Sequence, residues 1–474
     1  MRTTTSKVAV LLYRRRNRQY LDGLKTVSAS SRARGFTGTD LTHWFTGPAS
    51  MTVTKSVRDP AGTMSLVLPE RQSVEGGWLY DAVEPGDLIE VRFSRKPVAG
   101  LPPVYMRAVV THVERELSVA GGAPRHMVSI RAADFGHVLE ILRAYYKIDL
   151  KYARNLLDTF RMFTEYVAET PTAMSATDFL SMLSKKTLDP VLATMAGVIG
   201  NFPSGFTVDC SITDCINPKV FSDSQNGSIG TLIRNTLDVG PFNEFFIESV
   251  GAHERIVARP APWRTPAGLF ALPGAKAPAS TVLDFYADVE SIRVGRSDDG
   301  VATYFLVQSP SLDLGNPFST ARHNGCSTEA GDPNADPDVF GIRPLDVQMA
   351  THPPTGPLKA AVTAAAADSE SIRFTQWLQS KRDALMAANR DALVFESGTI
   401  VCADPSIRAG SEVVLSGAVG MGMRYYVPQV STRYDESGLT TTLSVERGTG
   451  WIDGQKSATG PASLLHLSRN IKGR

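Results

Sequence analysis

The stretch from residue 398 to residue 448 constrains the fold of this chain most, because its last part alternates with a period of two. Successive side chains at residues 439–446 fall into a mostly apolar set and a polar set. That alternation is typical of a β-strand with one buried face. Gly438 ends the tetrapeptide before it and permits the positive φ of a tight reversal. The inward set is Leu439, Thr441, Leu443 and Val445, and the outward set is Thr440, Thr442, Ser444 and Glu446.

A second strand is predicted just before that reversal. Residues 425–430 are rich in aromatic and β-branched side chains, which favour strands. Pro428 has no backbone N–H, so this strand is expected at a sheet edge or with a bulge. Upstream, a turn at 408–410 leads into a further strand at 412–415. Residues 398–448 therefore predict a small antiparallel barrel or split barrel of three or four short strands.

Three motifs in this stretch resemble a known family. They read P-x-I-R-x-G-x-x-V-x-L at 405–415, Y-Y-V-x-x-V-x-x-R-Y at 425–434 and G-L-T-T-T-L-x-V-E-R-G at 438–448. Their order resembles the C-terminal barrel of phage tail baseplate hub proteins and the hub portion of type VI secretion spike proteins. The words F-F-I-E at 245–248 and R-P-A-P-W at 259–263 also resemble that family.

The rest of the chain divides by changes in pattern. A length of 474 residues predicts about three domains, at roughly 150 residues each. Short strands at about ten-residue spacing in 36–133 suggest a barrel or a sandwich, and the turn at 85–87 resembles the turn at 408–411. Hub proteins of the resembled family carry two similar barrels per chain. The predicted fold class is mainly β with a helical insertion (α+β), with two small tube-like antiparallel β-barrels plus accessory domains.

The domain boundaries follow from these patterns and from helical periodicity. Ser175 to Asp178 has capping-box spacing, and residues 229–237 and 369–394 carry helical apolar stripes. Asp299-Gly300 predicts a hairpin between strands at 291–294 and 303–307. The segments are a basic N-terminal arm (1–35), a first tube-like β-barrel (36–133), a mostly helical domain (134–238), a β domain (239–310), a Pro/Gly/Asp-rich loop or linker (311–368), a helix plus second tube-like β-barrel (369–450) and a polar C-terminal tail (451–474).

Charge is nearly balanced overall but uneven along the chain. The net charge of +1 argues against attraction of the whole surface to nucleic acid or membrane. Residues 1–34 hold nine basic side chains against one acid. This arm either docks on an acidic neighbour or on nucleic acid, or is a solvated terminus. The apolar run at 8–13 is too short for a signal peptide, and no run approaches the roughly 20 apolar residues of a membrane span. The arm's basic cluster is Arg14, Arg15, Arg16 and Arg18.

Motifs of catalysis and of metal binding are missing from the sequence. It contains no Gly-Lys dipeptide, hence no P-loop, and neither a G-x-S-x-G nor an H-E-x-x-H motif. Residues 332–338 imitate the start of a calcium loop, but Pro337 stands where that loop needs Gly and Arg343 where it needs Glu. The four cysteines are too few for a disulfide framework. We predict no catalytic residue, no cofactor and no metal site.

The resemblance implies a structural role in a virion. It implies a homotrimeric baseplate hub that joins the tail tube protein to the central spike protein, contacts other baseplate proteins and encloses a channel through which DNA passes as cargo. Assembly is expected in the host cytoplasm, without stable membrane insertion. Thr440, Thr442 and Ser444 are candidate residues of a subunit interface. Two alternatives stay open: a carbohydrate-binding or hydrolytic β protein of the virion, and a nucleic-acid-binding protein acting through the basic arm.

Overall fold

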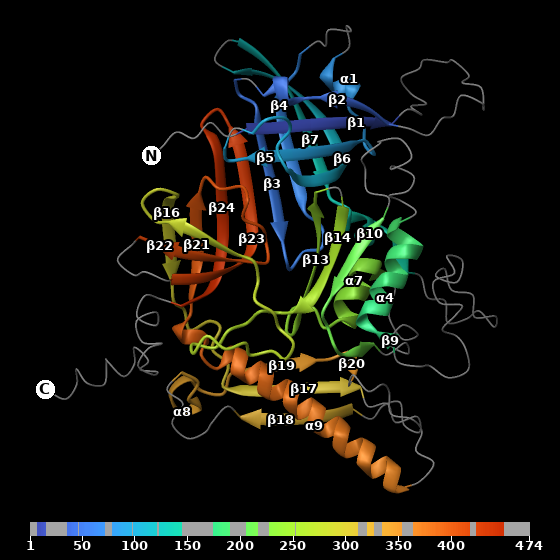
Figure 1. Cartoon of the computed structure of the whole chain (residues 1–474), viewed down its shortest axis with the longest axis vertical. Coiled ribbons are helices and arrows are strands. Elements are labelled where there is room, and N and C mark those ends of the chain that lie inside the picture. The colour runs from blue at the N-terminus through green and yellow to red at the C-terminus, as the bar shows by residue number, and fades with distance from the viewer. Residues whose placement is uncertain are drawn as a thin grey trace, which may run out of the picture.

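Two similar β modules, joined edge to edge, form the upper part of the molecule (Figure 1). The computed structural model describes residues 7–15, 36–45, 47–71, 78–96, 98–120, 123–144, 174–189, 205–216, 227–251, 253–310, 320–326, 334–352, 364–417 and 423–449.

The N-terminal module is an antiparallel sheet with strand order β2-β1-β5-β6-β7-β4-β3. Buried apolar side chains alternate along β3 and β4 and belong to one core, which includes Met51, Val53 and Leu66. A 3₁₀ turn, η2 (Thr42–Trp44), and a short helix, α1 (Leu79–Ala82), lie in its connections. The strands are β1 (Lys7–Arg15), β2 (Phe36–Asp40), β3 (Ser50–Ser56), β4 (Thr63–Pro69), β5 (Leu88–Ser94), β6 (Val104–Ala120) and β7 (Ala123–Ala133).

The C-terminal module has the order β15-β22-β23-β24-β21-β16 and its own core. Leu439, Thr441, Leu443 and Val445 are buried, and the alternate positions of the same strand are half-buried, so the predicted alternation is confirmed. The ladder between β23 and β24 shifts register across Pro428, which confirms the predicted bulge. The strands are β15 (Ser280–Asp284), β16 (Val289–Gly295), β21 (Glu396–Cys402), β22 (Ser411–Ser416), β23 (Met423–Asp435) and β24 (Gly438–Thr449).

The two modules share one 13-stranded sheet, because β3 pairs antiparallel with the second half of β23. Residues 411–415 of β22 occupy the same edge of β23 along its first half, up to Val427. Pro428 lies where one partner gives way to the other, and its carbonyl accepts a hydrogen bond from Val57 N at 2.9 Å. The expectation of two closed barrels is therefore corrected: the fold is mainly β with large antiparallel sheets, and this sheet is not closed.

Corresponding strands of the modules carry corresponding residues. Gly86 and Gly410 both have positive φ, at 92° and 82°. Each donates its N–H over 2.8 Å to a valine carbonyl, Val110 or Val427, and the next ladder shifts register just after that valine. Three residues after each of these valines, a row of directly paired residues crosses four neighbouring strands. In the N-terminal module the row is Val113, Ile130, Leu66 and Met51, and in the C-terminal module it is Val430, Leu443, Ile400 and Ile292.

These rows make β3 the counterpart of β16 and β6 the counterpart of β23. The sequences agree with that match, since residues 50–56 read S-M-T-V-T-K-S and residues 291–297 read S-I-R-V-G-R-S. The resemblance between the turns at 85–87 and 408–411 is thus part of an internal structural repeat.

A hairpin and short helices form the side of the molecule below the N-terminal module. The hairpin is β13 (Asn243–Val250) with β14 (His253–Pro260), and β10 (Phe206–Cys210) adds to it in parallel. Helices α2 (Gly136–Ile141), α4 (Ala176–Leu183) and α7 (Ile229–Thr236) pack on it, and α4 continues into a π-helical turn, η3 (Ser184–Leu188). Short pairs complete this part: β8 (Arg143–Ala144) with β12 (Gly227–Ser228), and β9 (Met174–Ser175) with β11 (Cys215–Ile216) and β20 (Thr351–His352).

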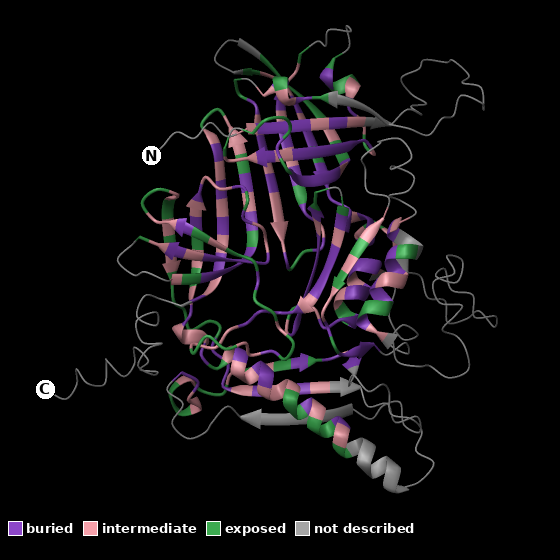
Figure 2. Ribbon diagram, in the orientation of Figure 1, coloured by how far each residue is buried: buried purple, intermediate pink, exposed green. Residues whose placement is uncertain are grey.

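The base of the molecule is a small sheet crossed by one long helix, α9 (Ala364–Asn389). The sheet has the order β18-β17-β19. Phe374, Leu378 and Leu385 of α9 are buried in the third core, as the helical stripe predicts. Figure 2 shows that the buried residues follow the inner faces of the sheets and of this helix. The remaining elements are β17 (Tyr304–Pro310), β18 (Thr320–Cys326), α8 (Pro337–Phe340), β19 (Pro344–Gln348) and the 3₁₀ turn η4 (Ala392–Val394).

The observed parts cut across several expected boundaries. Residues 7–15 of the expected basic arm form β1, because Val8, Val10 and Leu12 alternate into the core. Strands β15 and β16 belong to the C-terminal module and not to a separate β domain. The hairpin expected around Asp299-Gly300 is wrong, since β16 pairs with β21, and β17 with β18 and β19. The expected linker holds β18, α8, β19 and β20.

The capping prediction at residue 175 is confirmed. Ser175 Oγ accepts a hydrogen bond from Asp178 N at 3.1 Å and begins helix α4. The helix predicted at 229–237 is also present, as α7. A further helical stripe expected at 156–167 and the tail at 451–474 lie outside the described residues.

Candidate assembly site

A network of buried charges fixes the β13–β14 hairpin to the N-terminal module. Arg107 of β6 is 2% exposed and uses three guanidinium nitrogens. Nε donates to Glu90 Oε2 at 2.7 Å, Nη1 to Glu254 Oε1 at 2.9 Å and Nη2 to the Gly251 carbonyl at 2.6 Å. Ser249 Oγ accepts from Arg107 N and donates to Glu254 Oε2 at 3.0 Å. Since each buried polar group has a partner, the network ties this hairpin to the module in one arrangement.

Burial sets the protonation of this network. It raises the pKa of Glu254 to about 7, although the Arg107 guanidinium opposes that rise. A second buried pair lies beside it, in which Lys55 of β3 contacts Asp134 and donates to the Ile247 carbonyl at 2.7 Å. Burial raises the pKa of Asp134 as well, while Lys55 lowers it. Arg107 thus joins the N-terminal module to β14 through Glu254, and Lys55 joins it to β13 through the Ile247 carbonyl.

The same hairpin is fixed to the C-terminal module by its other end. Arg259 of β14 donates to Glu244 Oε2 at 3.1 Å and to the Gly410 carbonyl at 2.6 Å. Tyr426 of β23 donates to Glu244 Oε1 at 2.5 Å, and burial raises the pKa of Tyr426 well above its usual value. The β13–β14 hairpin therefore braces the junction between the two modules from below.

A direct clamp also crosses between the modules. Arg408, half-buried in the turn before β22, donates to the carbonyls of Tyr105 at 2.8 Å and Val104 at 3.0 Å. Its guanidinium carbon lies 4.1 Å from the centre of the Tyr105 ring, a favourable cation–π geometry. Burial lowers the pKa of Arg408. The R in the motif P-x-I-R-x-G thus holds the modules together.

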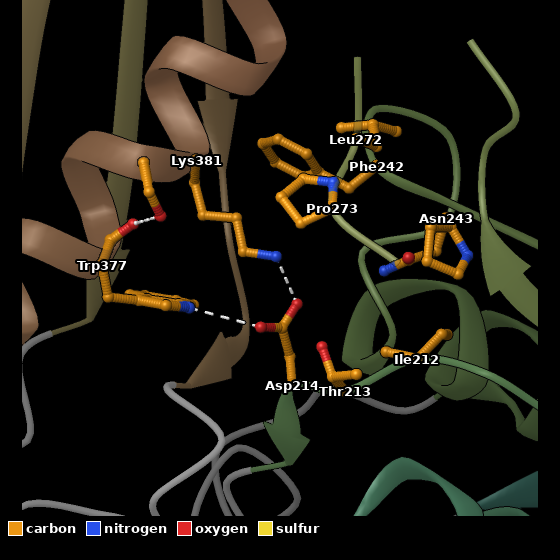
Figure 3. A pocket seen from close by; sticks show the side chains of 11 residues that line it. Ile212, Thr213, Asp214, Phe242, Asn243, Leu272, Pro273, Trp377 and Lys381 are labelled. Atoms are coloured by element: carbon orange, nitrogen blue, oxygen red, sulfur yellow. Dashed lines mark hydrogen bonds and ion pairs between the residues drawn. The ribbon is translucent and has the colours of Figure 1, made fainter. Parts of the chain in front are cut away.

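One small cavity, of about 150 Å³, lies where α9 meets the hairpin region. Lys381 and Trp377 reach from α9 toward Asp214 (Figure 3). Asp214 pairs with Lys381 and accepts from Trp377 Nε1 at 3.3 Å. Phe242 and Leu272 line the apolar side. Because the acid is already paired with the lysine and the indole, this cavity is best explained as a joint that fixes α9.

The described residues provide no obvious reactive centre. They contain no group of three or more His, Cys, Asp or Glu side chains placed to hold a metal ion. Cys210, Cys215 and Cys402 are free thiols, and burial raises the pKa of Cys402 to about 11. In the calcium-loop imitation, Asp336 caps α8, as its side chain accepts from Asp338 N. Within the described part of the chain, no helix has both the length and the apolar content to cross a membrane.

The sequence-predicted site residues lie apart from these networks. Thr440, Thr442 and Ser444 are half-buried on the outer face of β24, which has β23 on one side and β21 on the other. Because both edges of β24 are paired, this strand offers a neighbour its side-chain face and not a free backbone edge. Arg14 and Arg15 are in β1, opposite Thr37 and Phe36 of β2, and Arg16 and Arg18 lie outside the described residues.

Two features of the structure were not predicted from the sequence: the contacts of Arg107 and Arg408, and the unpaired edges of β16 and β6. Arg107 and Arg408 are surrounded by ordinary strand and turn residues, and only the R of P-x-I-R-x-G gave a signal. Within the described residues, β16 pairs with β21 alone, and the second half of β6 pairs with β7 alone. Unpaired strand edges are surfaces on which another strand can dock.

Several solved structures are similar to this chain. A tail protein from Neisseria meningitidis MC58 is 10% identical, with a TM-score of 0.46, covering 93% of this chain and 96% of its own. The 43 kDa tail protein of prophage MuSo2 from Shewanella oneidensis has the same identity and TM-score, with coverage of 93% and 98%. A type VI secretion component of E. coli, described as structurally similar to the phage T4 tail proteins gp27 and gp5, is 8% identical with a TM-score of 0.32, covering 84% and 73%.

These structures are phage tail proteins and a type VI secretion component, the two groups named by the sequence resemblance. No family model matches the sequence, and no curated protein matches it.

Proposed function

We propose that this chain is a structural hub of a phage-type tail. Three copies form a ring that joins the tail tube to the central spike and surrounds the path of the DNA. Its partners are further copies of itself, the tail tube protein, the spike protein and other baseplate proteins. The proposed role is mechanical and requires no catalysis or cofactor, and its place is the virion.

The internal repeat is the observation that carries this proposal. Two modules with matching strand orders, β1-β5-β6-β7-β4-β3 and β15-β22-β23-β24-β21-β16, lie in one chain. Three copies of such a chain supply six similar modules, so a threefold assembly can match a sixfold tube. The buried charges of the β13–β14 brace hold the two modules at one fixed angle, which a regular ring needs.

The outer face of β24 is the proposed contact with a neighbouring tail component. Thr440, Thr442 and Ser444 offer small hydroxyl groups on a rigid central strand, and such groups form hydrogen bonds at an interface without steric conflict. Thr442→Arg replaces a small hydroxyl side chain by a long charged one. It is expected to weaken binding of the neighbouring component, while the melting temperature stays close to that of the unsubstituted protein.

The mass in solution and a low-resolution image test the hub proposal together. Light scattering is expected to give three times the chain mass of 51.2 kDa, and negative-stain images a threefold ring with a central hole. A monomer at every concentration tested, or a ring of another symmetry, would contradict the proposal.

A further inference from the structure

Among the described strands, two edges on opposite modules are unpaired, although their counterparts pair with each other. In the internal junction, β3 docks on residues 429–434 of β23, the half of that edge which β22 leaves uncovered. The repeat makes β16 the counterpart of β3 and residues 112–117 of β6 the counterpart of 429–434. Strand β5 covers only residues 104–109 of β6, so the equivalent half-edge is unpaired by any described strand.

The two empty edges cannot meet within one molecule. In the strand order, β16 and β6 are separated by β21, β24, β23, β3, β4 and β7. Residues 112–117 begin eight residues, or about 26 Å, along β6 from Val104, the end of β6 that Arg408 of the C-terminal module contacts. Figure 1 draws β16 at the left of the molecule and β6 at the upper right. Neither edge therefore supplies the partner of the other within one copy.

We infer that β16 of one copy pairs antiparallel with residues 112–117 of β6 in a second copy of this chain. This inference rests on the proposed ring and names its joint. The register follows from the internal junction, where Tyr434 is opposite Met51, Arg433 opposite Thr52 and Val430 opposite Lys55. Transferred through the repeat, Leu117 lies opposite Ile292, Glu116 opposite Arg293 and Val113 opposite Arg296.

The side chains at the transferred positions fit each other. Glu116 would face Arg293 directly, with Glu114 on the diagonal of the same face; opposite charges in these positions stabilise a sheet pair. All three are exposed, and no described residue forms an ion pair with Glu116 or Arg293. On the other face, Leu117 is 63% exposed, whereas its counterpart Tyr434 is half-buried in the internal junction.

The joint is heterologous, because one edge type binds a different edge type. Repetition of such a contact gives either a closed ring or an open filament. Each copy contributes one internal junction, β3 with β23, and one external junction, β16 with β6. A ring of three then contains six junctions of one kind, alternately within and between chains.

Cysteine crosslinking tests the register. The full-length chain with Glu116→Cys and Arg293→Cys is oxidised and run on a non-reducing gel, and we expect covalent species up to the trimer. The matched control pairs Glu116→Cys with Glu290→Cys, which is exposed on the same strand but three residues, or about 10 Å, farther along. This control and each single variant are expected to stay uncrosslinked.

Charge reversal tests the same contact without a covalent bond. Glu116→Arg alone and Arg293→Glu alone are each expected to raise the protein concentration needed for assembly roughly tenfold. The double variant is expected to restore assembly. Circular dichroism of each variant checks that the exposed substitutions leave the fold intact.

The outcomes separate this inference from the proposed function. A trimer without the Glu116–Arg293 crosslink would overturn the joint and leave the hub intact. A ladder of crosslinked species that continues beyond three would support the joint and contradict the trimeric ring. A monomer that neither assembles nor crosslinks would overturn both.

Discussion

Three arginines, one buried and two half-buried, hold the parts of this molecule together at the residue scale. Arg107, Arg259 and Arg408 each donate to two or more acceptors on a different part of the chain. A guanidinium suits this role because its planar fork keeps its charge when desolvated and satisfies several acceptors at once. Removing such a group leaves buried acceptors short of a donor, which is costly.

Loss of Arg107 is expected to destabilise the fold strongly. Arg107→Ala leaves Glu90 and Glu254 buried without their common partner, and we expect a loss of about 3–5 kcal/mol in the free energy of unfolding. Urea denaturation measures it. Arg58→Ala is the control, because the Arg58 side chain is 64% exposed in its pair with Glu446. Equal midpoints for the two variants would contradict a structural role for the Arg107 network.

The protonation of Glu254 makes stability depend on pH. Its pKa of about 7 lies above the ordinary value of 4.5, because burial disfavours the charged form. The folded protein therefore holds a proton that the unfolded chain releases, so this contribution is full below pH 4.5 and is lost as the pH rises through 7. Glu254→Gln is expected to show a smaller fall in melting temperature between pH 5 and pH 8. An unchanged fall would show that another group titrates; Asp238, with a pKa of about 6, is present in both proteins.

At the scale of elements, α9 and the β13–β14 hairpin connect separate parts of the molecule. The hairpin touches both modules, and α9 connects the base sheet to the hairpin region through the Lys381–Asp214 pair. Gly410 shows how tight these contacts are, since a Cβ there would come within 2.8 Å of Arg259 Nη2 and 3.1 Å of the Phe246 ring. Such contacts leave little freedom for one part to move against another.

The joint of α9 is expected to show measurable coupling. In a double-mutant cycle with Lys381→Met and Asp214→Asn, we expect an interaction energy of about 0.5–3 kcal/mol, because both side chains are largely buried and in contact. The exposed pair Arg343–Asp298 provides a reference, for which about 0–1 kcal/mol is typical. Additive effects at Lys381 and Asp214 would mean that packing alone positions the helix.

At the scale of the whole molecule, the β3·β23 junction makes two modules into one rigid body. The Thr54 and Ser431 hydroxyl groups meet across it at 3.1 Å, and Tyr105 meets Thr432 at 3.0 Å in its buried layer. A junction with buried side chains and a continuous ladder resembles the interior of a sheet more than a contact between domains.

Hydrogen exchange tests that rigidity. Amides of β3 and of residues 429–434 are expected to exchange as slowly as those in the middle of β24, since all of them open only when the sheet opens. Mass spectrometry of exchanged peptides measures the rates. Fast exchange confined to the junction would show that the modules separate while each stays folded.

The sequence by itself determined local structure and the faces of strands. Period-two alternation placed Leu439 and Leu443 inside, the missing N–H of Pro428 marked a bulge, and Ser175 began a helix, because each of these depends on groups a few residues apart. Only the tertiary structure decided which edges meet: β1 between β2 and β5, β16 in the second module across a hundred-residue insertion, and β3 on β23. Alternation fixes the face of a strand but not its neighbour, and the partners of Arg107 and Arg408 come from distant segments that no local pattern connects.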